Sequence, residues 1–256
     1  MTFIKATPLN MDTLWPLLSP LRYDNLLDAL IHGFHGEMMT DDLKNPSVFL
    51  GFIGWNYYLS GNPNSKCAIE LIKKVPYDTE IHTTALWVKA LEAIYPNQLI
   101  RKTRYAHHAN DLNKDHLNKI INALNPNYHI KPIDKPLYNQ ILKEGWGEDF
   151  VGNFKDYQDF KENGLGFLVL DNETIISGCS SYIRFNGGYE IEIITRNDYR
   201  NQGLAKIIGA YFTLECLKRN KIPHWDAAHE SSKRLASKLG FTFAYAYEVF
   251  IIKEIT

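Results

Sequence analysis

The clearest hydrophobic pattern in the sequence lies in its second half, where three apolar runs are separated by short polar turns. The runs GLGFLVLDN, TIISGCSSYIRF and GYEIEIIT are rich in β-branched and aromatic residues, with Asp171-Asn172 and Asn186-Gly187-Gly188 between them. β-Branched and aromatic side chains favour strands, and Asn, Asp and Gly favour tight turns. The pattern therefore predicts three consecutive strands joined by hairpins.

After these strands in the sequence, the apolar residues recur with the period of a helix. GLAKIIGAYFTLECLK carries them three or four positions apart, and Lys218, Asn220 and Pro223 mark its end. HWDAAH predicts a short strand, SSKRLASKLG a helix capped by Ser and closed by Gly240, and FTFAYAYEVFIIKEI a long final strand. Upstream, YHIKPID predicts a strand, followed by helical segments to about Phe160. The predicted order from 127 onward is thus β-α-α-β-β-β-α-β-α-β.

The first half of the chain has mixed patterns. MDTLWPLLSPLRYDNLLDALIHGFHG predicts one or two helices interrupted by Pro16 and Pro20, and SVFLGFIGWNYYLSG predicts a strand with a bulge or turn. SKCAIELIKKV, TTALWVKALEAIYP and DHLNKIINAL have helical periods, and YAHHAN is expected to be a surface turn. We expect a mixed α/β protein, in which a smaller α/β domain (1–126) precedes a second domain (127–256) with a mixed sheet flanked by helices.

Charge and composition exclude several classes of function. The 256 residues contain 28 Lys and Arg against 29 Asp and Glu, a net charge of −1. Nucleic acids and anionic membrane surfaces require a broad positive field, which this balance does not supply. No segment approaches the roughly 18 apolar residues of a membrane span, and MTFIKATPLN has no apolar leader core. We therefore expect a cytoplasmic protein with neither a nucleic-acid nor a membrane partner.

Cysteine and histidine patterns give little support for a metal site. The three cysteines are far apart and form no CxxC pair, which argues against a disulfide framework or a zinc knuckle: Cys67, Cys179 and Cys216. His32, His35 and Glu37 have a spacing that could hold a metal, but two glycines interrupt the segment. No third strong ligand is evident nearby, so we expect no metal.

The segment DYRNQGLAK (198–206) lies where a predicted strand passes into a predicted helix. The first turn of a helix exposes unpaired backbone N–H groups at the positive end of its dipole, and such groups bind anions. Gly203 has no Cβ and allows close approach, and Arg200 adds a positive charge. Short glycine motifs recur by chance, so the segment by itself also fits a plain polar junction.

Together with their order along the chain, GYEIEIITRNDYRNQGLAKIIG and HESSKRLASKLGF resemble the GNAT superfamily of acyl-CoA N-acyltransferases. The resemblance covers about residues 128–256. It implies that an R-x-x-G-x-A/G loop grips the pyrophosphate of acetyl-CoA and that the preceding strand end pairs with the pantetheine arm. IPHWDAAHESSKRLASKLGF is most similar to a two-domain bacterial branch that includes zwittermicin-resistance type acetyltransferases. In that branch an α/β half precedes the catalytic half.

Carried over by residue, the resemblance assigns acetyl-CoA binding to the strand end, the loop and the start of the next helix: Ile193, Ile194, Thr195, Arg200, Asn201, Gln202, Gly203, Leu204, Ala205, Lys206, His229 and Ser232. Two positions depart from the family pattern. His229 stands where the family usually has Asn, and Ala236 stands where many members have a Tyr general acid. These departures leave the cofactor assignment intact and the identity of the acid open.

Acetyl transfer to an amine needs a base, because an alkylammonium with a pKa of about 10 is no nucleophile at neutral pH. In YEIEIIT, strand alternation places Glu190 and Glu192 on one face. Two carboxylates cannot both be buried there without partners, so that face either opens into a cleft or meets cations. Either glutamate could be the base, and a solvated sheet face with two uninvolved carboxylates is the structural alternative.

The reaction also needs a donor to the oxyanion and a proton for the thiolate. A strand-edge N–H in a bulge can supply the first, and Ser232 or His229 are candidates for the second. Tyr245 and Tyr247 alternate onto the same face as Phe241 and Phe243, and for them we expect core packing. Direct transfer in a ternary complex requires no cysteine nucleophile.

The leading hypothesis is an acyltransferase for groups other than aminoacyl groups. It would be an acetyl-CoA-dependent N-acetyltransferase acting on a primary amine of a small molecule, in a cleft between the two halves to which the first domain contributes. A catalytically inactive CoA-binding sensor or scaffold is a second hypothesis, and an N-acetyltransferase acting on proteins or peptides is a third. A homodimer is compatible with each of them.

Overall fold

The computed structural model describes residues 3–254, which form two compact units. One unit runs to Arg104 and takes in the segment from Tyr247 onward, and the other comprises Tyr105–Ala246. The domain boundary expected at 126/127 lies inside the second unit, in the turn after α5 (Lys114–Ile121), because α5 packs against α8 (Leu204–Lys218). The assignment of the two sequence halves to separate domains stays a prediction.

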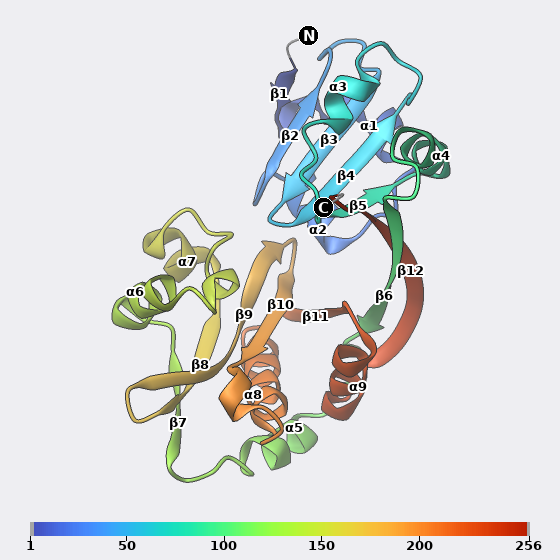
Figure 1. Cartoon of the computed structure of the whole chain (residues 1–256). Helices are drawn as coiled ribbons and strands as arrows, with labels where there is room; N and C mark the ends of the chain where they lie inside the picture. The colour runs from blue at the N-terminus through green and yellow to red at the C-terminus, as the bar shows by residue number, and fades with distance from the viewer. Residues whose placement is uncertain (1–2, 255–256) are drawn as a thin grey trace. The chain divides into compact units, whose positions relative to one another are not determined.

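The first unit is a mixed sheet with helices (Figure 1). Its strand order is β1-β2-β3-β4-β5, antiparallel except for the parallel pair β4 and β5. The last part of β12 (Thr242–Ile252) adds to β5 through Phe250 and Ile81. The other elements are β1 (Ile4–Ala6), α1 (Met11–Leu18), α2 (Asn25–Ile31), β2 (Glu37–Thr40), β3 (Val48–Ile53), β4 (Asn56–Gly61), α3 (Ala68–Ile72), β5 (Glu80–Thr83) and α4 (Ala85–Ile94).

A buried polar network ties α2 to this sheet. Asp24 caps α2 by accepting from the N–H of Leu27, and it also accepts a hydrogen bond of 2.6 Å from the hydroxyl of Tyr58. The imidazole of His82 stacks on the Tyr58 ring with 4.5 Å between centroids. Burial lowers the pKa of His82 to about 4, although the carboxylate of Asp24 acts in the opposite direction. His82 is therefore neutral in the folded protein at physiological pH.

This network predicts acid sensitivity of the fold. In the unfolded chain the pKa of His82 returns to about 6.5. Below that pH the unfolded state therefore binds a proton that the folded state does not bind until the pH is much lower. The free energy of unfolding should fall by about 2 kcal/mol from about pH 7 to about pH 5 through this residue alone. Urea unfolding at both pH values tests this, and His82→Gln should remove that part of the pH dependence. An unchanged pH dependence in the variant would exclude His82 as its source.

The second unit contains the elements that the sequence predicted from 127 onward, in the predicted order. Its sheet has the order β6-β11-β10-β9-β8-β7. Its further elements are β6 (Leu99–His108, which begins in the first unit), β7 (Tyr128–Pro132), α6 (Lys135–Glu144), α7 (Tyr157–Asn163), β8 (Gly166–Asp171), β9 (Thr174–Phe185), β10 (Gly188–Thr195), β11 (Ile222–Ala227) and α9 (Glu230–Leu239). The expectation of a mixed sheet flanked by helices is confirmed.

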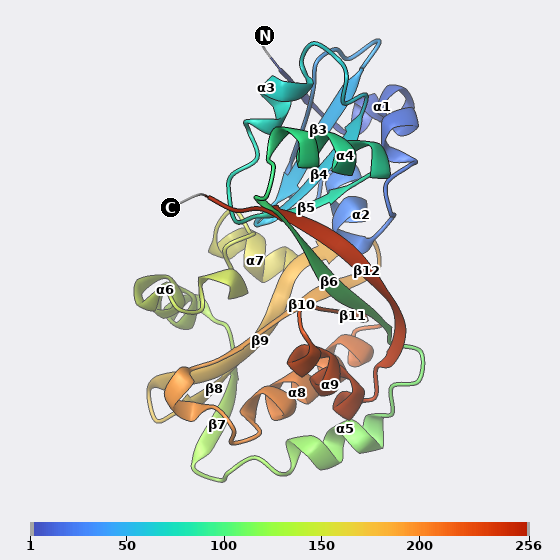
Figure 2. The ribbon, with the colours of Figure 1, turned by 45° about the vertical axis from the view of Figure 1, so that its right-hand side comes forward.

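Helices cover both faces of this sheet (Figure 2). On one face, α5, α8 and α9 enclose a core that includes Trp225 and the partly buried Ile191 and Ile193. On the other, α6 and α7 enclose a second core that Ile194 adjoins. The alternation expected for β10 is therefore present, and it assigns Glu190 and Glu192 to the face that Ile194 shares.

Strand β11 changes its partner halfway along. Ile222–His224 pair in parallel with β10, whereas Trp225–Ala227 pair antiparallel with β6. Alternate residues of a strand direct their N–H and C=O groups to the same side, so the backbone positions of Pro223 and Trp225 both face β6. Proline has no N–H to donate there. This proline explains why pairing with β6 does not extend toward the start of β11.

Several sequence expectations differ from the structure. Most of YAHHAN is not a surface turn, because Tyr105–His108 form the end of β6 and Tyr105–His107 pair with β11. The strands β1, β2 and β5 have three or four residues each and left no alternating signature. The residue before α9 is His229 rather than a serine, and no side chain caps that helix. Within residues 3–254, no helix has both the length and the apolar character needed to cross a membrane.

Candidate active site

The loop between β10 and α8 has a backbone suited to an anion. Asn201 and Gly203 both have positive φ values, 64° and 81°. Gly203 directly precedes Leu204, the first residue of the fifteen-residue α8. A Cβ built on Gly203 would meet no atom within 4 Å, so the side of the glycine that a side chain would occupy is open. The first N–H groups of α8 therefore lie beside an accessible space, as a diphosphate requires.

Side chains around the loop hold it in place. The hydroxyl of Tyr128 donates to Oε1 of Gln202 over 3.4 Å, and Nε of Arg200 donates to the carbonyl of Thr195 over 3.4 Å. Arg200, Asn201, Gln202 and Gly203 are exposed, whereas the side chain of Leu204 is buried in the core. Leu204 can therefore serve a ligand only through its backbone, while Arg200 presents its charge to solvent.

The strand that leads into this loop is paired differently on its two edges. Along its whole length, β10 pairs with β9, and a register shift lies between Glu190 and Ile191. With β11 it pairs only over Gly188–Glu190, opposite Ile222–His224. The N–H of Ile193 donates to Oε1 of Glu192 over 3.2 Å, a side-chain acceptor rather than a strand partner. The two strands thus part after Glu190, and Ile193, Ile194 and Thr195 follow that point.

The expected carboxylates have different surroundings. Glu190 is only 5% exposed, and its Oε2 lies 2.6 Å from Nδ1 of His224 on β11. Glu192 lies two residues further along β10 and is half-buried. The structure thus resolves the choice between an open cleft and a cationic partner differently for each: Glu190 has an imidazole partner, and Glu192 contacts its neighbouring backbone.

His224 was not among the sequence candidates. Its hydrogen bond to Glu190 depends on the register of β10 against β11, which places the two residues directly opposite each other. The sequence signal that could have found it is alternation in IPHWDA, where Trp225 and Ala227 are buried and His224 and Asp226 face the other way. We refer below to these two residues as the Glu190/His224 pair.

The two candidate acids lie apart from this pair. Ser232 accepts a hydrogen bond of 3.0 Å from Nε1 of Trp225, whose side chain belongs to the core beneath α8 and α9. Adjacent strand residues point to opposite faces, so Ser232 and His224 are on opposite sides of the sheet. His229 is exposed at the start of α9. The structure therefore brings neither Ser232 nor His229 to the Glu190/His224 pair.

The aromatic residues of β12 are also placed differently from the sequence expectation. Phe243 and Tyr245 are 45% and 44% exposed, so neither is packed in the core. The half-buried Lys233 and the exposed Phe243 form a cation-π contact with 5.0 Å from Nζ to the ring centroid. The prediction of core packing is wrong for Tyr245, because this part of β12 is not covered by the core of the second unit, whereas Tyr247 is half-buried.

The cysteine side chains are poorly placed to act as nucleophiles. All three cysteines are buried. Burial raises the pKa of Cys179 far above its usual range and also raises that of Cys216. Within the described part of the chain no cluster of His, Cys, Asp and Glu has the composition of a metal site.

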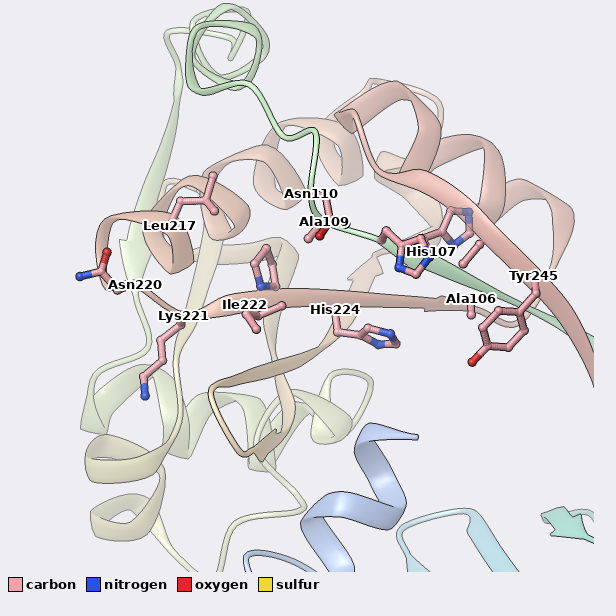
Figure 3. A pocket seen from close by; sticks show the side chains of 13 residues that line it. Ala106, His107, Ala109, Asn110, Leu217, Asn220, Lys221, Ile222, His224 and Tyr245 are labelled. Atoms are coloured by element: carbon pink, nitrogen blue, oxygen red, sulfur yellow. The ribbon is translucent and has the colours of Figure 1, made fainter. Parts of the chain in front are cut away.

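A cavity of about 400 Å³ lies beside His224 within the second unit (Figure 3). Its walls come from the end of β6, the end of α8, the first half of β11 and from β12. Tyr245 and Ile222, which is 52% exposed, contribute apolar surface to it. A volume of this size suits a small organic molecule.

Comparison with known proteins agrees with this geometry. A curated N-acetyltransferase of uncharacterised function, YdfB of Bacillus subtilis (strain 168), is 24% identical over 241 residues, covering 88% of each chain. The crystal structure of a GCN5-related N-acetyltransferase-like protein from Streptococcus suis 89/1591 is 30% identical. It superposes with a TM-score of 0.86 over 97% of this chain and 100% of that one.

A more distant structure, an acetyltransferase of the GNAT family from Colwellia psychrerythraea, shares the fold at 13% identity. Its TM-score is 0.55, over 99% of this chain and 100% of that one. The family model described as GNAT acetyltransferase matches residues 17–250, which includes most of both units. The chain belongs to the GNAT acetyltransferase family.

Proposed function

We propose that this chain transfers an acetyl group from acetyl-CoA to a primary amine of a small molecule, by direct attack in a ternary complex. The observation that carries the proposal is the Glu190/His224 pair. The pair bridges β10 and β11 at the last position where these strands are hydrogen-bonded, and the same β10 continues into the Gly203 loop. The site thus joins an anion-binding loop to a carboxylate-imidazole pair through one strand.

The loop residues fit the diphosphate of acetyl-CoA. Backbone N–H groups from Gly203 to Lys206 and the guanidinium of Arg200 are the donors, and Asn201 and Gln202 lie beside them. The strand end Ile193–Thr195 lies where the pantetheine arm would run, and the arm would take over the N–H of Ile193 from the side chain of Glu192. When bound, acetyl-CoA supplies the thioester that acylates the amine.

The Glu190/His224 pair can hold the proton that the ammonium must lose. With Nδ1 of His224 donating to Glu190, the other ring nitrogen of the imidazole is the basic one. The buried carboxylate fixes the orientation of the ring and stabilises its protonated form. Glu190 thus acts through His224, and Glu192 remains a candidate for a second, water-mediated route.

The cysteines do not compete with this route. A covalent acetyl-enzyme would need a thiolate, and burial opposes ionisation of Cys179 and Cys216. Direct attack by the deprotonated amine requires only that both substrates be held together, which is the role proposed for the Gly203 loop and the Glu190/His224 pair.

The proposal is tested by incubating the protein with acetyl-CoA and a panel of small amines, a peptide substrate and a protein substrate. Released CoA thiol and the acetylated product are measured together. We expect product and thiol in equal amounts with a small amine. Tight acetyl-CoA binding without any product would favour the sensor hypothesis, and product only from the peptide or protein would favour the third hypothesis.

A further inference from the structure

The cavity beside His224 has a structural cause in the sequence. Pro223 cannot donate a hydrogen bond toward β6, so the pairing of β11 and β6 begins only at Trp225 and His107. Before that point the two strands part, and the cavity occupies the space between Ile222–His224 and the residues that follow β6. On its other edge, β11 pairs with β10 only as far as His224, so His224 lies both beside the cavity and at the end of the β10–β11 pairing.

The walls of this cavity carry an uneven distribution of charge. Among the thirteen residues that line it there is a lysine, Lys221, and there is neither Asp nor Glu. Asn220 and Lys221 lie at one end of the group, and His224 and Tyr245 lie at the other (Figure 3). Lys221 is exposed and extends away from His224, so it can meet only the far end of a molecule that reaches His224.

We propose that this cavity binds the acceptor, and that the acceptor is an elongated primary amine with a carboxylate at its opposite end. This inference rests on the proposed acetyl transfer and names the class of its substrate. The amine lies at the His224 imidazole, which Glu190 orients, the carbon chain lies against Ile222, and the carboxylate lies near Lys221 and Asn220.

The spacing along the chain limits the length of this acceptor. Lys221 directly precedes β11 and is three residues from His224, so their Cα atoms are at most about 10 Å apart. The α-amine of an amino acid is attached to the same carbon as the carboxylate, so an acceptor acetylated at its α-amine is too short to reach both ends. An ω-amino acid such as 6-aminohexanoate has a suitable length and fits a cavity of about 400 Å³.

The transfer step balances without a further reactant. The amine nitrogen forms a bond to the acetyl carbon while the bond from that carbon to sulfur breaks. The nitrogen loses two protons on the way from ammonium to amide. One is released when the ammonium is deprotonated at His224, and the other accompanies formation of the CoA thiol.

The test for the carboxylate compares 6-aminohexanoate with its carboxamide as acceptors. In Lys221→Gln, we expect the KM for the carboxylate to rise about threefold to tenfold, as for a partly exposed charge contact, with the KM for the carboxamide unchanged. Lys238→Gln, an exposed lysine of α9 outside the cavity, is the matched control. Equal KM values for the two acceptors in the wild-type protein would overturn the assignment of a carboxylate.

A second test fills the cavity with a larger side chain. Ala109→Phe should raise the KM for either acceptor at least about tenfold and leave the KM for acetyl-CoA unchanged, since a buried ring occupies the ligand volume. Ala123→Phe places the same ring on the exposed turn after α5 and serves as the control. An unchanged acceptor KM in Ala109→Phe would show that the acceptor binds elsewhere.

Calorimetric titration with 6-aminohexanoate separates this inference from the proposed function. If the protein acetylates no amine but binds 6-aminohexanoate, and Ala109→Phe and Lys221→Gln both weaken that binding, then the cavity assignment stands and acetyl transfer fails. If the protein acetylates other amines but neither binds nor acetylates 6-aminohexanoate, the transferase stands and this acceptor class is wrong.

Discussion

Replacing Glu190 by glutamine is expected to lower kcat about a hundredfold to a thousandfold, the usual contribution of general acid-base catalysis. Glutamine keeps the volume and can still accept a hydrogen bond from His224, so the fold should persist. It removes the negative charge that stabilises the protonated imidazole. Steady-state release of CoA thiol with a saturating amine measures kcat, and the dissociation constant of acetyl-CoA should remain unchanged.

Companion variants separate this role from a structural one. His224→Gln should lower kcat to a similar extent, and the double variant should be little worse than either single variant, because the two residues act as a unit. Glu192→Gln should lower kcat about tenfold or less if Glu192 serves only a secondary route. A large loss in Glu192→Gln, with little loss in Glu190→Gln, would identify Glu192 as the base.

Replacing Gly203 by alanine is expected to weaken acetyl-CoA binding about tenfold to a hundredfold. The methyl group would project into the open space beside the first N–H groups of α8, where the diphosphate must approach. The positive φ of 81° adds backbone strain of about 1–2 kcal/mol for a residue with a Cβ. Calorimetric titration with acetyl-CoA measures the binding loss.

Gly145→Ala is the matched control for this strain. Gly145 ends α6 with a φ of 76°, and a Cβ there would also meet no atom within 4 Å. The two variants should lose similar stability to thermal unfolding, but only Gly203→Ala should lose acetyl-CoA affinity. Equal affinities in the two variants would show that the Gly203 loop does not bind the diphosphate.

The sequence predicted the elements of the second unit well because their signals are local. The strand β9 and the helix α8 have twelve and fifteen residues, long enough for periodicity to show, and glycine or asparagine marks their ends. The position of Gly203 at a strand-to-helix junction was predicted for the same reason, whereas the binding role of its loop came from the family resemblance and stays a prediction.

The residues that were missed depend on pairing between distant segments. His224 meets Glu190 only because β11 aligns with β10 in one particular register. Ser232 and Trp225 show the same limit, because their hydrogen bond fixes the serine on the far side of the sheet from His224. The Tyr105–His108 segment reads as polar and turn-like, yet pairing with β11 makes it a strand.

The most direct test of the account is the structure of this protein in complex with CoA. The diphosphate should lie on the backbone N–H groups that begin at Gly203, with Arg200 beside it. The pantetheine arm should follow Ile193–Thr195 and end with its sulfur next to Glu190 and His224. A CoA molecule bound away from the Gly203 loop, or one whose sulfur points away from His224, would contradict it.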